Sequence, residues 1–219
     1  MNTKLILNFL SKLAANNNKT WFDANRDEYK IVKDNYYELV AEFIRRITEF
    51  DQSVAQLEPK HCVYRINRDI RFSSDKTPYK DWLGAYIVQG GKKQMRAGYY
   101  VHLQPNECII ATGLHCPTPD WLLRVREHIS GDGNDLMKHY TNKKFKDVWG
   151  NFLGDSLKKA PHNFDNDDKY IDLIKMKTYD LVHNYTDSEI YDTKKFIDSA
   201  VKKFALAKPV NDFFNEVLM

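Results

Sequence analysis

The spacing of apolar residues changes twice along the chain, and each change predicts a change in secondary structure. Apolar side chains first recur at every third or fourth position. This period predicts a short amphipathic helix over residues 4–14 and a long helix that ends near residue 50. Trp21 and Phe22 stand near the start of the long helix, and we expect them to anchor it to the core.

From residue 60 the apolar period falls to two, which is typical of β-strands. Cys62, Tyr64 and Ile66 alternate with their neighbours as the residues of a strand do. Three more β-rich runs follow, with turn-forming GGKK and QPNE segments between them: GAYIVQGG, AGYYVHLQ and ECIIATG. Strands joined by such short loops are typical of an antiparallel meander, so we expect a sheet over about residues 60–113.

Helical signals return after the sheet. Thr118 stands before a proline and is a predicted N-cap, and the SGDGND segment is the predicted end of that helix. Thr186 and Glu189 have the spacing of a capping box, which predicts another helix start. Pro209 is expected to interrupt the last helical pattern and to leave a short helix after it.

This order of elements predicts an α+β fold, in which N-terminal and C-terminal helices flank a mainly antiparallel sheet at about residues 60–113. Hydrophobic residues make up 42% and aromatic residues 13% of the 219 positions, which is enough for a sizeable core. No repeat or low-complexity linker interrupts the chain. We therefore predict a single domain over residues 1–219.

Several classes of site lack support in the sequence. No stretch approaches the roughly 18 uncharged apolar residues of a membrane helix, and the N-terminus does not resemble a signal peptide. Cys62, Cys108 and Cys116 form no C-x-x-C pair, so we expect reduced thiols in a cytoplasmic protein. The spacing of Cys108, His115 and Cys116 matches no zinc site, and no metal is expected. No P-loop, G-x-G-x-x-G, G-x-S-x-G or H-E-x-x-H pattern is present, and no cofactor is expected.

Positive charge is concentrated where the chain enters the predicted sheet. The net charge is only +3, but residues 60–80 hold two acids, Asp69 and Asp75, and six bases: Lys60, Arg65, Arg68, Arg71, Lys76 and Lys80. This segment has a local charge of +4, and the other 27 basic and 28 acidic residues leave −1 for the rest of the chain. The segment is therefore the first place to look for a site that binds anions.

The pattern Arg65-x-x-Arg68-Asp69-x-Arg71-Phe72, with Asp75-Lys76-x-x-Tyr79, resembles the signature of an uncharacterised bacterial family, domain of unknown function 2461. The similarity extends over the whole chain, through FLSKLAANNNKTWFDANRDEY, GYYVHLQP, the helix with Arg126 and Ile129, and LKKAPHNFDNDDKYIDLIKMK. Asn163 and His115 depart from the expected glycine and aromatic residue, although asparagine tolerates a positive φ. The resemblance implies no function, because the activity of this family is not established.

If the segment is extended, its side chains alternate between two faces. Ile70 and Phe72 are then expected in the core, and Arg68 is drawn inward with them. A buried arginine needs a partner, which Asp69 or Asp75 can supply. Arg71 lies on the other face and is expected to be more exposed. If the chain instead turns after Ile66, the arginines converge on one point.

Two interpretations of the charged segment remain open. In the first, Arg65, Arg68, Arg71, Lys76 and Tyr79 bind a phosphorylated or carboxylated small molecule, because guanidinium groups bind such anions through paired hydrogen bonds. In the second, these arginines pair with aspartates in a structural network that has no ligand. The excess of positive charge favours the first, because a purely structural network tends toward neutrality.

Asp69, Asp75 and His102 are the candidates for acid–base chemistry, and the sequence assigns no reaction. Neighbouring arginines lower the pKa of an aspartate, so the two carboxylates are expected to orient arginines. In the run AGYYVHLQ, His102 is predicted to share a face with Tyr100 and Gln104. The favoured interpretation of His102 is a polar surface residue.

A nucleic-acid-binding module is the alternative function. Its arginines and lysines would contact phosphates while aromatic rings stack on bases. The isoelectric point of about 8.5 disfavours it, because nucleic-acid-binding domains commonly exceed about 9. No membrane partner is expected, and nothing in the sequence specifies an oligomeric state. A protein-interaction scaffold explains none of the arginine spacing.

Overall fold

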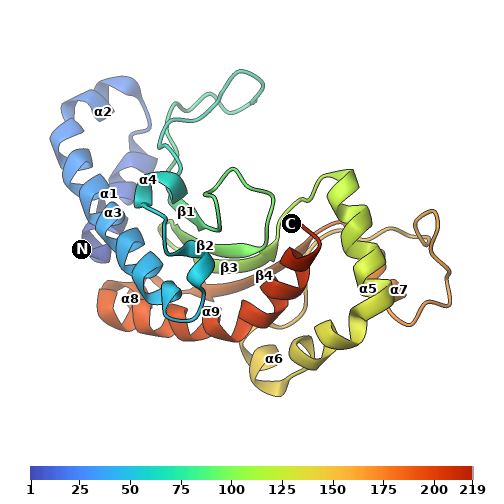
Figure 1. The fold of residues 1–219 in the computed structure, drawn as a ribbon. Helices are drawn as coiled ribbons and strands as arrows, with labels where there is room; N and C mark the ends of the chain where they lie inside the picture. Colours follow the sequence, from blue (N-terminus) through green and yellow to red (C-terminus); the bar gives the residue numbers. More distant parts are fainter. Residues whose placement is uncertain (219) are drawn as a thin grey trace. The chain divides into compact units, whose positions relative to one another are not determined.

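The computed structural model describes residues 1–218, which fold into helices and a four-stranded antiparallel sheet (Figure 1). The strands are hydrogen-bonded in the order β1-β2-β3-β4. The elements are α1 (Thr3–Ala15), α2 (Lys19–Ala24), α3 (Arg26–Thr48), the 3-10 helix η1 (Gln52–Val54), α4 (Pro59–Cys62), β1 (Leu83–Ile87), β2 (Gly98–Leu103), β3 (Cys108–Leu114), α5 (Pro119–Tyr140), α6 (Lys143–Trp149), α7 (Ile171–Ile174), β4 (Tyr179–Tyr185), α8 (Asp187–Tyr191) and α9 (Thr193–Glu216). The predicted α+β class, with helices flanking an antiparallel sheet, is confirmed.

The chain divides into two compact units. The first contains residues 1–92, 100–110 and 184–202, and the second contains the remaining described residues. Each unit has buried apolar side chains of its own. The prediction of a single domain over residues 1–219 stays a prediction.

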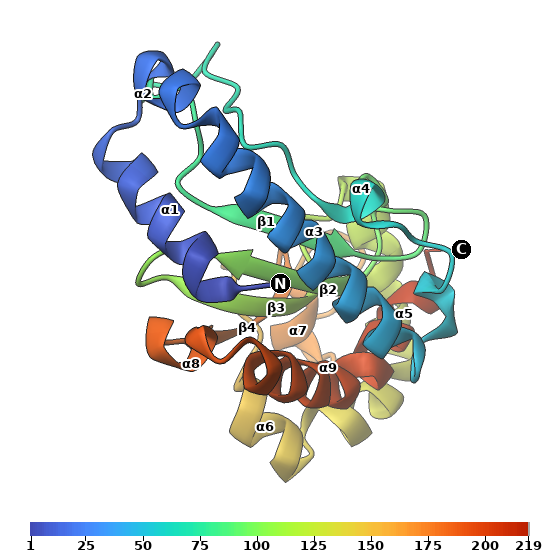
Figure 2. The same cartoon turned by 90° about the vertical axis from the view of Figure 1, so that its left-hand side faces the viewer.

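The helices at the N-terminus build one side of the first unit. The side chain of Asn2 caps α1 by accepting a hydrogen bond from Leu5 N (3.0 Å), and Asn18 caps α2 in the same way through Trp21 N (2.9 Å). The apolar stripes of α1 and α3 are fully buried, and the two helices pack side by side (Figure 2). Both predicted helices are confirmed within a few residues at each end. Phe22 is buried as expected, but it lies on the short helix α2.

The sheet differs from the prediction at both of its ends. Residues 59–62 are a turn of helix, because Pro59 occupies the first helical position and Glu58 and His61 form a capping box. The alternation of Cys62, Tyr64 and Ile66 therefore did not indicate a regular strand, and the first strand starts only at Leu83. Strand β4 lies outside the region of about residues 60–113 to which we assigned the sheet. The predicted alternation along β2 is confirmed, since Tyr99, Val101 and Leu103 are buried and the residues between them, Tyr100 and His102, are half-buried.

In the second unit, α5 begins after Thr118 as predicted but continues through the SGDGND segment to Tyr140, with a kink at Asp132. The predicted interruption is therefore present at Asp132, where φ is −115° and ψ is 15°, and a second helical stretch follows it. Neither glycine of the segment adopts the positive φ that commonly ends a helix. Gly133 instead gives room to the ring of Tyr170, which a Cβ atom would meet at 2.6 Å.

Two other expectations concern the C-terminal half of the chain. The Thr186–Glu189 capping box is present at the start of α8, as predicted. Pro209 does not interrupt the last helix, because α9 runs through it and the following turns bury Val210, Phe213 and Phe214.

Asn163 has a φ of 72°, which explains how asparagine replaces the expected glycine. Among residues 1–218, no helix combines the length and the apolar character that crossing a membrane requires.

Candidate functional site

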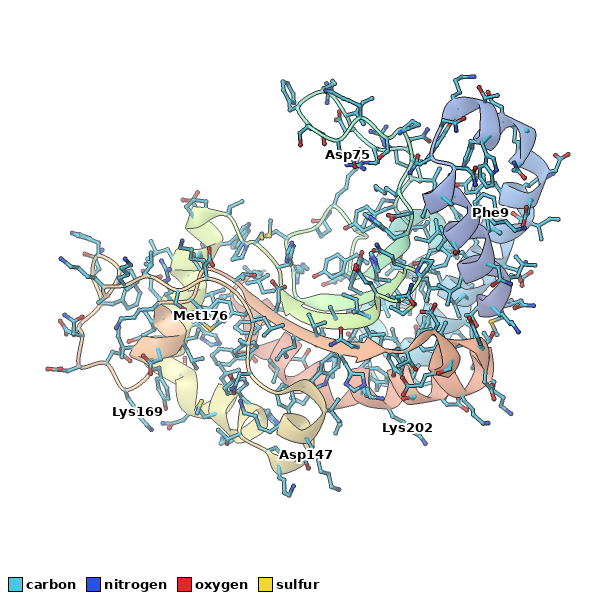
Figure 3. The ribbon with its side chains drawn as sticks, turned by 180° about the vertical axis from the view of Figure 1, so that it is seen from behind. Phe9, Asp75, Asp147, Lys169, Met176 and Lys202 are labelled. Atoms are coloured by element: carbon cyan, nitrogen blue, oxygen red, sulfur yellow. The ribbon has the colours of Figure 1, made fainter. Side chains whose placement is uncertain are left out.

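Residues 63–82 form an irregular two-stranded segment, which we call the arm. Its two sides pair in antiparallel fashion, with hydrogen bonds from Lys80 N to Ile66 O (2.8 Å) and from Arg68 N to Pro78 O (3.0 Å), and Tyr64 N donates to Gly84 O of β1 (2.9 Å). Residues 68–77 form the loop at its end, which we call the tip. Figure 3 shows the tip, with Asp75 labelled, extending away from the sheet.

The base of the arm is fixed to α2 and to the turn before it. The Asn17 side chain donates to Tyr79 O (2.9 Å) and accepts from Tyr79 N (3.1 Å), so it satisfies both backbone groups of that residue. The Tyr79 ring stacks on Phe22 with a centroid distance of 3.9 Å and an angle of 15°. Both rings are buried, and the base of the arm is therefore a rigid part of the first unit.

A cavity of about 420 Å³ lies at the base of the arm, and we call it the arm-base cavity. One side is formed by α2 and α3 and the other by the arm and the first residue of β1. The lining residues are Phe22, Arg26, Tyr29, Lys33, Tyr36, Tyr37, Val63, Tyr64, Arg65, Ile66, Asn67, Tyr79 and Leu83. The cavity has a size typical of small-molecule sites.

The charged residues that line the arm-base cavity are all basic: Arg26, Lys33 and Arg65. Arg26 is paired with Asp23 at 2.5 Å, and the Lys33 ammonium lies 5.3 Å from the Tyr37 ring centroid. The Arg65 guanidinium makes no hydrogen bond and no ion pair with any residue from 1 to 218. Arg65 and Lys33 are therefore the lining cations without an anionic partner, and of these two Arg65 alone has a guanidinium that can bind an anion through paired hydrogen bonds.

Three of the tyrosines that line the arm-base cavity, Tyr29, Tyr36 and Tyr64, are neutral hydrogen-bonding groups at physiological pH. Burial raises the pKa of Tyr29 to about 12, and burial also raises the pKa of Tyr64. Tyr36 is fully buried and its hydroxyl donates to Val101 O at 3.1 Å. The phenols of Tyr29 and Tyr64 therefore remain protonated beside the basic residues and can donate to an anion.

At the tip, Arg68 is held by groups of the same loop. It forms a short ion pair with Asp75 and donates to the Thr77 hydroxyl at 2.6 Å. Hydrogen bonds from the Thr77 backbone N–H, from Arg68 and from the Thr77 hydroxyl lower the pKa of Asp75 to about 2. The Arg68 side chain is 28% exposed and that of Arg71 is 76% exposed, which is the order that we predicted.

The other two basic residues of the tip also have partners within it. Arg71 binds Asp69 through two hydrogen bonds, Nε to Oδ1 at 2.9 Å and Nη2 to Oδ2 at 2.6 Å. These side-chain bonds, and to a smaller extent a bond from the Arg71 backbone N–H at 3.4 Å, lower the pKa of Asp69. Lys76 Nζ donates to Ile70 O at 3.0 Å. The carboxylates of the tip therefore orient arginines, as the sequence indicated.

The expectation that Phe72 lies in the core is wrong. Its side chain is 96% exposed, and Ile70 is only half-buried. The reason is that the arm leaves the sheet, so alternation along residues 65–72 does not separate a core face from a solvent face. Asp75 and Thr77, rather than apolar neighbours, make Arg68 less exposed than Arg71.

His102 lies on β2 and is absent from the lining of the arm-base cavity. Its Nδ1 is 2.8 Å from the Tyr100 hydroxyl and its Nε2 is 2.9 Å from Gln104 Oε1. Burial lowers its pKa, against a smaller opposing effect of the bond with Gln104. Both ring nitrogens are occupied, and the Trp82 ring lies 4.9 Å away. In this arrangement His102 has no nitrogen free to exchange a proton with a substrate.

The structure brings together only some of the residues predicted for the site. Arg65 and Tyr79 line the arm-base cavity, whereas Arg68, Arg71 and Lys76 are engaged in the tip. The residues that α3 contributes to the cavity were not predicted. A signal for them exists, because Arg26, Tyr29, Lys33 and Tyr37 follow one another at intervals of three, four and four residues, which places them on one face of a helix.

No curated protein and no solved structure matches the sequence at a level that indicates a relative. A family model does match, over residues 5–213, which is nearly the whole chain. The chain therefore belongs to the family of conserved hypothetical proteins designated domain of unknown function 2461, DUF2461.

Proposed function

We propose that this protein binds a small phosphorylated or carboxylated molecule in the arm-base cavity, with Arg65 as its principal anion ligand. One observation carries the proposal: a guanidinium without an ion pair or hydrogen bond lines a cavity that has no acidic lining residue. A cation in such a place is stabilised when an anion binds, because it gains charge-assisted hydrogen bonds without losing an existing partner.

The other lining groups favour the same class of ligand. Lys33 adds a second cation, and Arg26 a third whose charge is partly offset by Asp23. The phenols of Tyr29 and Tyr64 stay protonated and serve as neutral donors. Arg68, Arg71 and Lys76 remain predicted ligand residues, although binding there would require them to exchange their present partners for the ligand.

Titration calorimetry with inorganic phosphate, a phosphate monoester and a carboxylate tests the proposal. Arg65→Gln should weaken binding about 10- to 150-fold, because a hydrogen bond to a charged group is worth about 1.5–3 kcal/mol. Arg45→Gln is the matched control, since it removes an arginine of α3 that is absent from the cavity lining and is already paired with Glu42, and it should change the affinity less than about twofold. Equal effects of the two substitutions would refute the assignment of Arg65.

Ionic strength provides an independent test. Binding should weaken as salt is raised, because exposed charges are screened over about 10 Å at 0.1 M. Tighter binding at high salt would exclude an electrostatic site. A short oligonucleotide titrated in parallel tests the alternative function: nanomolar affinity for it would favour a nucleic-acid-binding module over a small-molecule site.

A further inference from the structure

We infer that the ligand of the arm-base cavity is an aromatic acid, a molecule with a planar ring next to its phosphate or carboxylate group. This inference rests on the proposed function and adds the chemistry of the uncharged part of the ligand. It follows from the side chains that surround the three cations.

Aromatic rings dominate the uncharged lining of the cavity. Tyr29, Tyr37 and Tyr64 are half-buried and come from both of its sides, α3 and the arm. Behind them, Phe22 is 4.9 Å from the Tyr29 ring and stacks on Tyr79 at 3.9 Å. Rings prefer offset or edge-to-face neighbours at centroid distances of about 4.5–7 Å, so a planar ligand ring finds suitable partners here.

The polar groups of the lining discriminate against a sugar phosphate. A sugar presents several hydroxyl groups, and each needs an acceptor as well as a donor when it is buried. The charged and phenolic side chains of the lining offer mainly donors, and no Asp or Glu lines the cavity. Asn67 supplies the one side-chain amide among the lining residues. An aromatic ring makes no such demand, because it has no hydroxyl group to satisfy.

The cations lie close enough to rings for one molecule to contact both kinds of group. The Lys33 ammonium is 5.3 Å from the Tyr37 ring centroid, and the Lys80 ammonium is 5.6 Å from the Tyr64 ring centroid. A ring against Tyr37 or Tyr64 therefore places an attached anionic group near a cation. The volume of about 420 Å³ exceeds that of a single ring with one anionic group, so the site also admits larger aromatic acids.

The test compares phenyl phosphate with cyclohexyl phosphate, which has the same charge and a similar size but no aromatic face. Phenyl phosphate should bind about 2- to 10-fold more tightly, the range expected of an aromatic contact. Benzoate and cyclohexanecarboxylate form a second pair, which shows whether a phosphate or a carboxylate carries the preference. Equal affinity within both pairs would overturn the inference.

Variants locate the preference. Tyr64→Leu should abolish the preference for the aromatic member of each pair, whereas Tyr64→Phe should keep it. Both variants lose the phenol donor, so their affinities for inorganic phosphate should agree within about twofold. Tyr37→Leu is a second variant for the same purpose if Tyr64→Leu does not fold. Unchanged preference in both leucine variants would overturn the inference.

The two proposals fail in different ways. If inorganic phosphate and cyclohexyl phosphate bind as tightly as phenyl phosphate and all depend on Arg65, the anion site stands and the aromatic ligand is wrong. If none of these anions binds, or if binding is indifferent to Arg65→Gln, the proposed function fails and the inference fails with it.

Discussion

Phe22 and Phe72 provide a matched test of where the arm stands relative to the core. Both are phenylalanines that the sequence analysis assigned to the core, and the structure separates them: Phe22 is 6% exposed and Phe72 is 96% exposed. Phe22 also contacts the rings of Tyr79 and Tyr29 at 3.9 and 4.9 Å. Phe22→Ala should lower the free energy of unfolding by about 3–5 kcal/mol, and Phe72→Ala should change it by less than about 0.5 kcal/mol.

Urea denaturation of the wild type and both variants measures the difference. A loss of 3–5 kcal/mol shifts the midpoint by about 1–2.5 M if the slope stays near 2–3 kcal/mol/M. In thermal denaturation, the same loss lowers Tm by about 6–20 °C. Trp21 fluorescence is a suitable probe, because its ring lies 5.8 Å from Phe9 in the core of the first unit.

Similar midpoint shifts for the two variants would refute the reasoning. A large effect of Phe72→Ala would mean that the tip packs against another part of the protein. A negligible effect of Phe22→Ala would mean that the stacked pair does not hold the arm to α2. The second outcome would also mean that the base of the arm, which lines the arm-base cavity, is not rigidly held.

Three further predictions follow from the backbone and from two titrating groups. Gly113→Ala should prevent stable folding, because the residue has a φ of 96° and a Cβ atom would lie 2.0 Å from a backbone oxygen of β4. Gly131 lies in an open part of α5, so Gly131→Ala should raise the free energy of unfolding by about 0.5–1 kcal/mol. Thermal denaturation measures both effects. Burial lowers the pKa of His102, so just below pH 6.5 the folded state binds fewer protons than the unfolded chain, and stability falls as the pH drops below 6.5. The fall should be smaller in His102→Gln, and identical pH profiles of stability for the variant and the wild type would contradict this prediction. The contacts of Asp75 should be complete above pH 3.8 and be lost only as the pH falls through about 2; an NMR titration of its carboxyl carbon with a midpoint near 3.8 would show that Thr77 and Arg68 do not hold it.

The fold class could be predicted because the apolar period changes from helical to extended and back, and this depends only on neighbouring residues. The errors lie where a local signal competes with the period. Pro59 and its capping box convert the first alternating residues into helix α4. In β4, Tyr179 and Leu181 alternate as strand residues do, but the segment lies among helical patterns. Its pairing partner, β3, is more than sixty residues away, so the sequence nearby does not indicate the strand.

Only part of the candidate site could be predicted, because the rest depends on contacts between residues that are not neighbours in sequence. The composition of the arm indicates an anion site, but which arginine is available depends on the path of the loop. Arg71 reaches Asp69, two residues before it, and Arg68 reaches Asp75, seven residues after it. These distances in sequence are equally compatible with other pairings. The contribution of α3 depends on tertiary packing, which brings a helix of the first fifty residues against the arm.

The six basic residues of the segment 60–80 therefore fall into two groups: five have an acidic or hydrogen-bonding partner, and one has none. Two of its arginines and both of its acids neutralise each other in the tip, and Lys60 is paired with Glu58 at 2.8 Å. Lys76 and Lys80 each donate to a backbone carbonyl oxygen. Among the six basic residues of this segment, all of which lie in the described part of the chain, Arg65 alone has an unengaged charged group.

Arg65 is also the member of this set that lines a cavity. The parts of the arm on both sides of Arg65 are held in place: the ion pairs of the tip fix the loop, and the hydrogen bonds of Asn17 with Tyr79 fix the base. When a ligand orders an exposed arginine, the side chain loses conformational entropy, and the free energy gained from the anion contact must exceed this loss. A rigid base reduces the remaining loss, since the backbone that carries Arg65 is already ordered before the ligand arrives. The density of charge in the arm thus serves mostly to shape it, and the binding that we propose depends on the one arginine that this shape leaves without a partner.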